Sequence, residues 1–378
     1  MKTKRSPISY LFIVGVQALT LSYAELSPRR AEAAYDYNIS QIAPVNLTMT
    51  QIAAILNHTA PSADAPNKPY LNAYQQTTTT DATGAIVLLA PVKVVQTDDP
   101  NHPYLGVFHN QVTTTKFATY AAYSLDLFKW HTLGAIDDVA LNEYGSQPDI
   151  RILPDDSVLF AEEYNPASKP QIRVRYYGGT AAETGLQAFI LNPGVTPTNQ
   201  ITLPNINRLS QADGTPEFGR IDYNGSILSA KVEVTHHYFN LGVRDLQAVG
   251  TLTNFKRWSD STDTTINNLV TNAGGNGKIG DREVFKVGST VYEVVEAQVN
   301  PTSGSDYGSW RLFFINKTLN TIQQLSPVLV GGAQSLGNPT VSFITLPGGG
   351  PALVFTCFVF SENDGTTLPG GHMYVYPL

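Results

Sequence analysis

The sequence GTPEF at residues 214–218 decides the fold, because related phrases occur at three other places in the chain. GDREV at 280–284 and GNPTV at 337–341 repeat it, and GSQPDI at 145–150 is a looser copy. In each phrase a glycine turn gives way to an acidic or polar residue, and a run typical of a β-strand follows. A second strand-like run comes about ten residues later. The phrases therefore indicate a repeated structural unit.

The spacing of the repeats indicates what this unit is. The acidic or polar slot falls at positions 149, 217, 283 and 340, so the steps are 68, 66 and 57 residues. A second pattern, Ser124 to Trp130, has a related ending at Asn254 to Trp258, which lies 128 residues later, or two periods of 64. Its expected role is a polar corner before an outer strand whose tryptophan covers the flank of the unit. A period above 50 with several strands per unit favours the blades of a β-propeller.

We therefore predict an all-β fold, a single five-bladed β-propeller over residues 69–378. The expected units are 69–144, 145–213, 214–279, 280–336 and 337–378. The last unit is short, and we expect a strand from the N-terminal side to complete it, since ring closure removes exposed strand edges. No long amphipathic helix is indicated after residue 60.

Composition agrees with a β-rich globular body. Hydrophobic residues make up 42% and aromatic residues 10%, but charged residues only 15%. Solvent-facing helices usually carry many Lys and Glu residues, so this balance favours strands and turns. The formal net charge of -7 argues against nucleic acid as a partner.

The N-terminus predicts export. Basic residues at positions 2, 4 and 5 precede an apolar run that ends near Ala24, and Ala31-Glu32-Ala33 offers a small-x-small cleavage site. We expect residues 1–33 to be a signal peptide and the mature protein to be secreted, with no membrane association. An uncleaved membrane anchor is the alternative.

Residues 34–68 are expected to form a short N-terminal extension that lies against the propeller. A short helix through Ile52 to Leu56 would be capped by Asn46 or Thr48 and stopped by Pro61. Cys357 is the single cysteine, so no internal disulfide can form, and we expect a monomer held together by its core and by ring closure.

The repeated slot is the first candidate for chemistry. In a propeller the first strands of all blades start near one end of the channel, which would bring together Asp149, Glu217, Glu283 and Thr340. Clustered carboxylates raise one another's pKa, and a protonated carboxyl facing an ionised one is suited to breaking glycosidic bonds. The alternative is a structural role in binding turn amides or a cation, for which calcium is the candidate. The first blade offers only Asp81, without the glycine phrase.

A second matched slot lies in the second strands, where His109, Glu163 and Glu296 align. Hydrogen bonds between blades are the preferred explanation for the two glutamates, and binding of a substrate is the alternative. Trp310, with Tyr307, falls in a Gly- and Ser-rich turn and could stack on a sugar or pack on a blade. No phosphate loop, dinucleotide fingerprint or metal-binding cysteine pair occurs, so no cofactor is required and no catalytic metal is expected.

These motifs resemble the five-bladed propeller glycosidases of the arabinanase, xylosidase, levansucrase and invertase superfamily, and glycoside hydrolase family 43 most of all. The resemblance rests on Ser124 to Trp130, on Pro148-Asp149-Ile150 and on Gly214 to Glu217, within residues 80–378. It implies that Glu217 is the general acid, that Asp149 tunes its pKa, and that Asp81 is the base. Asp81 departs from the family pattern, because the family's first-blade Asp opens its strand in a recognisable context.

We therefore expect an exported glycoside hydrolase that acts on polysaccharide or oligosaccharide, such as a pentofuranoside or xyloside. A propeller that binds carbohydrate or another surface without catalysis is the alternative, because one fold can host both functions.

Overall fold

The computed structural model describes residues 42–59, 74–75, 79–80, 86–87, 92–165, 169–204, 212–240, 244–327, 334–360 and 370–378. The chain divides into two compact units, Met1–Asp36 and Tyr37–Leu378, and every described residue belongs to the second. The predicted signal peptide lies outside the described residues. Within them, no helix is both long enough and apolar enough to span a membrane.

The second unit is built from five β-sheets, named blades 1 to 5 and given from the inner strand outward. Blade 1 contains β4 (Lys93–Gln96), β5 (Tyr104–Thr113), β6 (Lys116–Ser124) and β7 (Trp130–Ala135), extended by β2 (Thr79–Thr80) and β3 (Ile86–Val87). Blade 2 contains β8 (Gly145–Ile152), β9 (Val158–Tyr164), β10 (Gln171–Tyr177) and β11 (Asn199–Thr202). Blade 3 contains β12 (Asp213–Asp222), β13 (Lys231–Asn240), β14 (Arg244–Thr253) and β15 (Arg257–Thr262). Blade 4 contains β16 (Ile279–Val287), β17 (Thr290–Gln298), β18 (Trp310–Asn316) and β19 (Thr321–Gln324). Blade 5 contains β20 (Leu336–Thr345), β21 (Pro351–Val359), β22 (Gly370–Pro377) and β1 (Tyr74–Gln75).

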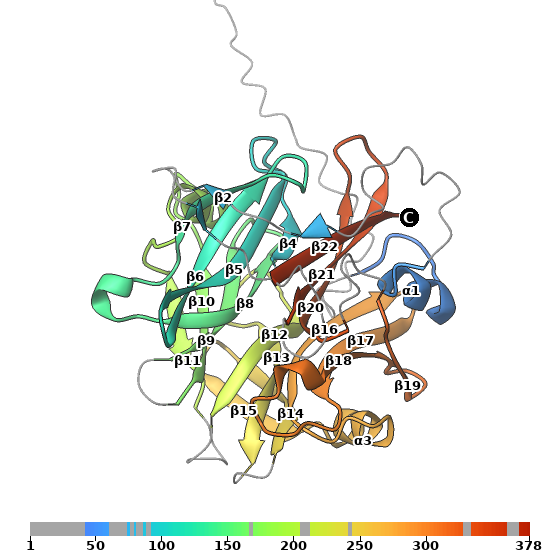
Figure 1. The fold of residues 1–378 in the computed structure, drawn as a ribbon. Coiled ribbons are helices and arrows are strands. Elements are labelled where there is room, and N and C mark those ends of the chain that lie inside the picture. The colour runs from blue at the N-terminus through green and yellow to red at the C-terminus, as the bar shows by residue number, and fades with distance from the viewer. Residues whose placement is uncertain are drawn as a thin grey trace, which may run out of the picture. The chain divides into compact units, whose positions relative to one another are not determined.

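The inner strands close a ring. β4 contacts β8, β8 contacts β12, β12 contacts β16, β16 contacts β20, and β20 contacts β4 again (Figure 1). Neighbouring inner strands belong to different sheets, so the five sheets follow one another around a common centre. The predicted five-bladed β-propeller is confirmed.

The repeated glycine phrases lie inside the inner strands. In β8, β12, β16 and β20 the register against the second strand slips by one residue at the phrase, as in a β-bulge. We expected the glycine phrase to form a turn before each strand. Instead each inner strand begins at or before the glycine, and the phrase forms the bulge within the strand. A bulge re-aims the residues that follow it, so each copy delivers the next side chain in the same way.

The last blade is completed from the N-terminal side, as predicted. β1 pairs antiparallel with β22, with Tyr74 opposite Met373. Because β1 covers the outer edge of β22, the final sheet gains a fourth strand and loses an exposed edge.

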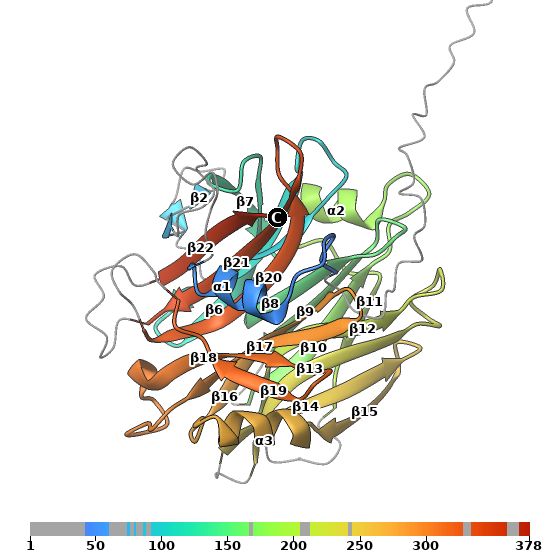
Figure 2. The ribbon, with the colours of Figure 1, turned by 90° about the vertical axis from the view of Figure 1, so that its right-hand side faces the viewer.

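The part of the chain that the structure describes contains three short α-helices. Helix α1 (Met49–Leu56) begins at the predicted cap, where Thr48 accepts from the backbone of Gln51, and its apolar side packs with strands of blades 4 and 5 (Figure 2). Helices α2 (Gly185–Leu191) and α3 (Thr264–Asn272) were not predicted. Both are shorter than three turns, so the helical periodicity in the sequence is weak.

The two tryptophans of the repeated corner cover glycines on other strands of their own blades, Gly106 on β5 and Gly250 on β14. Trp130 and Trp258 begin or nearly begin their outer strands and are buried. A Cβ atom at Gly106 would come 2.7 Å from the Trp130 ring, and one at Gly250 would come 1.9 Å from Trp258. Each indole therefore occupies the space above a residue without a side chain; the sequence pattern predicted a tryptophan on the flank of the blade but not the glycine beneath it.

Candidate active site at the centre of the ring

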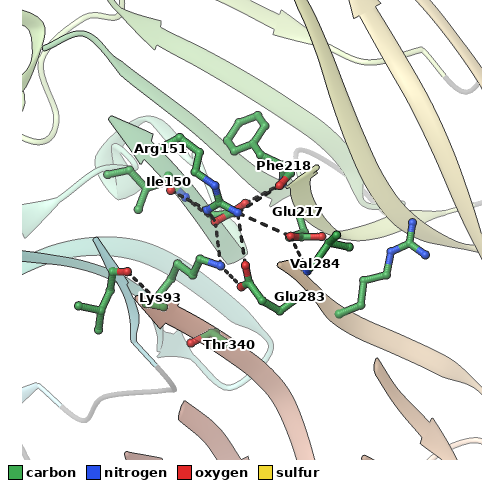
Figure 3. Close-up of polar contacts among 12 residues, drawn as sticks. Lys93, Ile150, Arg151, Glu217, Phe218, Glu283, Val284 and Thr340 are labelled. Carbon is green, nitrogen blue, oxygen red and sulfur yellow. Dashed lines mark hydrogen bonds and ion pairs between the residues drawn. The ribbon is translucent and has the colours of Figure 1, made fainter. Parts of the chain in front are cut away.

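Three carboxylates from three blades meet at one guanidinium group. Arg151 on β8 places Nη2 3.6 Å from Glu217 Oε1 and 3.5 Å from Glu283 Oε1, and its Nη1 bonds to Asp149 (Figure 3). The ring thus brings together acids that are separated by more than 60 residues in the sequence. The predicted convergence of these three side chains is present in the structure.

A lysine completes this group from blade 1. Lys93 on β4 forms an ion pair with Glu283 and lies 3.7 Å from Asp149 Oδ1 (Figure 3). The five side chains, Lys93, Asp149, Arg151, Glu217 and Glu283, are called the central hub below. Blade 1 therefore contributes a cation at the innermost position, where an acid was sought. Asp81 lies outside the described residues.

Backbone amides of the next blade bind two of the acids. Asp149 accepts from the N–H of Phe218 at 2.7 Å, and Glu217 accepts from the N–H of Val284 at 2.9 Å. Each donor directly follows the slot residue of the following blade. Thr235 also donates its hydroxyl to Glu217 at 2.9 Å. The two bonds from backbone amides tie consecutive blades together. Binding turn amides was the structural role considered for these acids, and here the amides belong to inner strands.

Burial governs the protonation of the hub. Asp149, Glu217 and Glu283 are 3%, 2% and 1% exposed. Burial raises the pKa of Glu217 to about 7, although Lys93 and Arg151 oppose the change. Burial also lowers the pKa of Lys93 to about 8, and the Arg151 charge acts in the same direction. Glu217 can therefore hold or release a proton near neutral pH.

The second-strand residues anchor the bulges of the next blade. His109 accepts from the backbone N–H of Gln147 at 3.2 Å, and Glu163 accepts from that of Thr215 at 3.3 Å. Glu296 on β17 accepts from the N–H of Asn338 in the same manner. These are the hydrogen bonds between blades that the matched slot suggested.

The anchoring side chains have shifted protonation equilibria. Burial raises the pKa of Glu163 and of Glu296 to about 7, and lowers the pKa of His109 to about 4. His109 is therefore a neutral acceptor at physiological pH, as its hydrogen bond requires.

Thr340 lies at the corresponding slot of β20, opposite Thr356, and the aromatic candidates lie on blade 4. Thr340 shares a hydrogen bond of 2.7 Å with Thr356 in its own blade. Trp310 opens β18 and is only 8% exposed, so it packs in the fold and presents little face to a ligand. Tyr307, three residues earlier, is 46% exposed.

Sequence reasoning missed the two cations. Lys93 is the one charge in the apolar run 92–95, and a charge on a buried strand needs a partner. Arg151 lies two residues after Asp149, so the two side chains share a face of the strand. Both signals are visible in the sequence, but the repeats drew attention to acids alone.

A second buried charge cluster lies between blades 1 and 2. Its members are Asp137, Glu143, Glu162, Arg173 and Arg175, called the Arg173 cluster below. Arg173 bonds Asp137 through Nη2 at 2.7 Å and Glu162 through Nε at 2.7 Å. Burial, reinforced by the Asp137 charge, raises the pKa of Glu162 to about 7.

Among the described residues, no group of three or more His, Cys, Asp or Glu side chains is arranged to hold a metal ion. The acids of the hub are bound by protein cations and amides instead.

Comparison with solved structures finds several that are similar to the chain at low sequence identity. A thermostable family-43 glycoside hydrolase is 11% identical, with a TM-score of 0.48, over 80% of this chain and 91% of that one. An exo-β-1,3-galactanase from Clostridium thermocellum is 11% identical, with a TM-score of 0.49, over 81% and 62%. An α-L-arabinofuranosidase from Lactobacillus brevis is 11% identical, with a TM-score of 0.46, over 77% and 90%. No protein-family model and no curated protein matches the chain. At these identities the role of each residue depends on this chain's own contacts.

Proposed function

We propose that the protein is a glycoside hydrolase that acts on a neutral polysaccharide or oligosaccharide, with Glu217 as the proton donor. The observation that carries the proposal is the position of Glu217 at the centre of the ring, where carboxylates from three blades meet. Its carboxyl has a pKa raised to about 7 and shares one guanidinium with two further carboxylates. A carboxyl that is protonated near neutral pH beside an ionised one is the pair that cleaves glycosidic bonds.

The proposed reaction is hydrolysis, in which one water molecule is consumed for each glycosidic bond that breaks. Glu217 would donate its proton to the leaving glycosidic oxygen as the bond to the anomeric carbon breaks. The oxygen of a water molecule would bond to that carbon and give its proton to a second carboxylate. The resemblance assigns this second role to Asp81 and the tuning role to Asp149. No cofactor is needed for these steps.

Two of the hub carboxylates lie close together. Glu217 Oε1 and Glu283 Oε1 both lie within 3.6 Å of one nitrogen of Arg151. They are therefore at most about 7 Å apart, and Glu283, the extra acid of blade 4, is the carboxylate to compare with Asp81 for the second role.

The test is a screen of chromogenic aryl pentosides and hexosides with the wild type and Glu217→Gln. We expect the wild type to hydrolyse at least one substrate, and Glu217→Gln to lose at least about 100-fold in kcat, since a general acid contributes that much. Glu162→Gln is the matched control, because Glu162 is as buried and has the same raised pKa but belongs to the Arg173 cluster. Equal activity of Glu217→Gln and Glu162→Gln would overturn the assignment.

A carbohydrate-binding propeller without catalysis is the second candidate, and the observation that favours it is the closed hub. Lys93 fills the blade 1 position and the acids are at most 3% exposed. A wild type that binds a glycan in the same screen and hydrolyses none would establish this second function.

We also propose that the protein is exported and monomeric. The basic and apolar character of residues 2–24 and the small residues at 31–33 support export. N-terminal sequencing of the protein recovered from culture medium, with light scattering for its mass, tests both statements. Protein that stays inside the cells or starts at Met1 would contradict export.

A further inference from the structure

One buried carboxylate fastens two bulges of neighbouring blades. Glu296 accepts from the N–H of Asp281 at 2.8 Å through Oε1, and from the N–H of Asn338 through Oε2. Asp281 belongs to the bulge of β16 and Asn338 to the bulge of β20. The two residues are therefore neighbours across the boundary of blades 4 and 5, held from behind by a side chain that is 5% exposed.

Asn338 is held in an uncommon conformation with its side chain unused. Its φ is 47°, in the left-handed region, and its side chain is partly exposed. Within the described residues the Asn338 amide makes no hydrogen bond through its side chain. Gly337 beside it has no room for a Cβ atom, which would lie 2.7 Å from the Phe360 ring. A rigid backbone thus presents a free donor and a free acceptor.

An exposed aromatic side chain contacts the bulge of β20 through Phe360. Tyr307 is 46% exposed, and its ring lies 5.2 Å from that of Phe360, the side chain that covers Gly337. The carbonyl of Tyr307 also accepts the hydroxyl of Ser335 at 2.7 Å, which ties the Tyr307 turn to the start of β20. Tyr307, Phe360 and the bulge of β20 therefore form a continuous contact.

We propose that Asp281, Asn338 and Tyr307 form a sugar-binding subsite on blades 4 and 5. Asp281 and Asn338 hydrogen-bond to hydroxyl groups of one neutral sugar unit, and the Tyr307 ring packs on its apolar face. A few fixed polar groups beside an aromatic surface are what a ligand site of this class needs. This subsite deepens the proposed function and rests on it for the class of ligand.

The subsite adjoins the hub. Loss of hydration, and after it the Glu296 charge, raises the pKa of Asp281 well above its usual range. Of the hub charges, Glu217 raises this pKa further and Lys93 lowers it. Asp281 is partly exposed, whereas Glu283, two residues along the same strand, is 1% exposed. A sugar held by Asp281 would therefore lie two residues along the strand from a hub carboxylate.

The test is affinity electrophoresis in native gels cast with soluble arabinan, galactan or xylan. The variants are Asn338→Gly, which keeps the left-handed backbone and removes the amide, and Tyr307→Ala. The matched controls are Asn320→Gly, at an exposed position with a φ of 54°, and Phe128→Ala, at an aromatic residue 36% exposed. Thermal unfolding of every variant checks that it is folded.

We expect at least one glycan to retard the wild type and both controls. Asn338→Gly and Tyr307→Ala should bind about tenfold more weakly, the effect of one lost hydrogen bond or stacking contact. A wild type that no glycan retards, or folded variants retarded as strongly as the wild type, would overturn the subsite.

The outcome is separable from the hydrolase proposal. Retardation that depends on Asn338 and Tyr307, without hydrolysis of any glycoside, supports the subsite and removes the catalytic role. Hydrolysis that depends on Glu217, with both variants retarded normally, removes the subsite alone.

Discussion

The central hub and the Arg173 cluster have the same charge composition but lie in different parts of the propeller. Each contains two cations and three carboxylates, and in each burial raises the pKa of one glutamate, Glu217 or Glu162, to about 7. The hub draws its residues from the inner strands of four blades. The Arg173 cluster lies on one side, on β9 and β10 of blade 2 and on the segment that joins blade 1 to blade 2.

This comparison shows that a raised carboxyl pKa does not by itself mark a site of catalysis. Structural ion-pair networks perturb pKa values as strongly as active sites do. What distinguishes the hub is that its carboxylates come from several blades and meet at the axis, beside the bulges. Position at the centre of the ring therefore carries the functional argument, and the protonation equilibrium supports it.

Replacing the arginine should have the largest effect in both regions. Arg151→Met leaves three buried carboxylates facing Lys93 alone, and Arg173→Met leaves Asp137 and Glu162 with Arg175. Breaking a buried ion pair on one side costs about 3–5 kcal/mol of the free energy of unfolding. Urea unfolding of the two variants measures it. A loss below about 1 kcal/mol in Arg151→Met would show that water reaches the hub.

The pH dependence of stability should follow next. Glu217 and Glu162 have folded-state pKa values of about 7, above the ordinary value of 4.5. Their contribution is fully present below about pH 4.5 and is lost as the pH rises through 7, because the folded state binds more protons than the unfolded state. We expect Glu217→Gln and Glu162→Gln each to flatten the decline between pH 5 and 8 by on the order of 1–3 kcal/mol.

Unfolding free energies at several pH values between 5 and 8 test this. Lys93 does not affect the window below neutrality, because its folded-state pKa is lowered to about 8 and the unfolded state binds more protons than the folded state only above that pH, where Lys93 makes stability rise with pH. A wild-type stability that rises from pH 5 to 7 would contradict the sign.

Removing one hydroxyl from each region should have a smaller effect. Thr235 donates to Glu217 at 2.9 Å, and Thr119 donates to Asp137 at 2.8 Å and contacts Glu162 at 3.0 Å. Thr235→Val and Thr119→Val should each lower the free energy of unfolding by about 1–2 kcal/mol. If Glu217 works as proposed, the Thr235 variant alone shifts the pH profile of kcat.

The smallest effect is expected at the surface. Arg220 and Asp222 form an ion pair of 2.8 Å with side chains 55% and 37% exposed. Arg220→Met should change the free energy of unfolding by less than about 0.5 kcal/mol, because solvent screens exposed pairs. A larger loss in the same urea titration would mean that burial does not explain the difference between arginines.

The fold could be predicted because its signals are local and repeated. The phrase at 214–218 and its copies carry a glycine at which a side chain would collide with a neighbouring strand, and the same bulge recurs in four inner strands. Strand closure by β1 follows from the need to cover the edge of β22. Helices α2 and α3 could not be predicted, because they are too short for periodicity to show.

The site could be predicted in part. Repetition pointed to Asp149, Glu217 and Glu283, but Lys93 belongs to the inner strand that lacks the glycine phrase. Lys93 pairs with Asp149 and Glu283 only because ring closure brings β4 close to β8 and β16, and no local sequence pattern reveals which inner strands come together. The sequence did not indicate Asp281 as a site residue, because the bulge inserts one residue into β16 and so changes which side chain faces outward.

The junction of β1 with β22 has a consequence for synthesis on the ribosome. Among the described strands, β1, which completes blade 5, is made first and its partner β22 is made last. Blades 1 to 4 can pair their own strands as they emerge, but the circle stays open until β22 has been made. A nascent chain stalled before β22 would therefore expose the edge of β21, where a chaperone or a second nascent chain could attach.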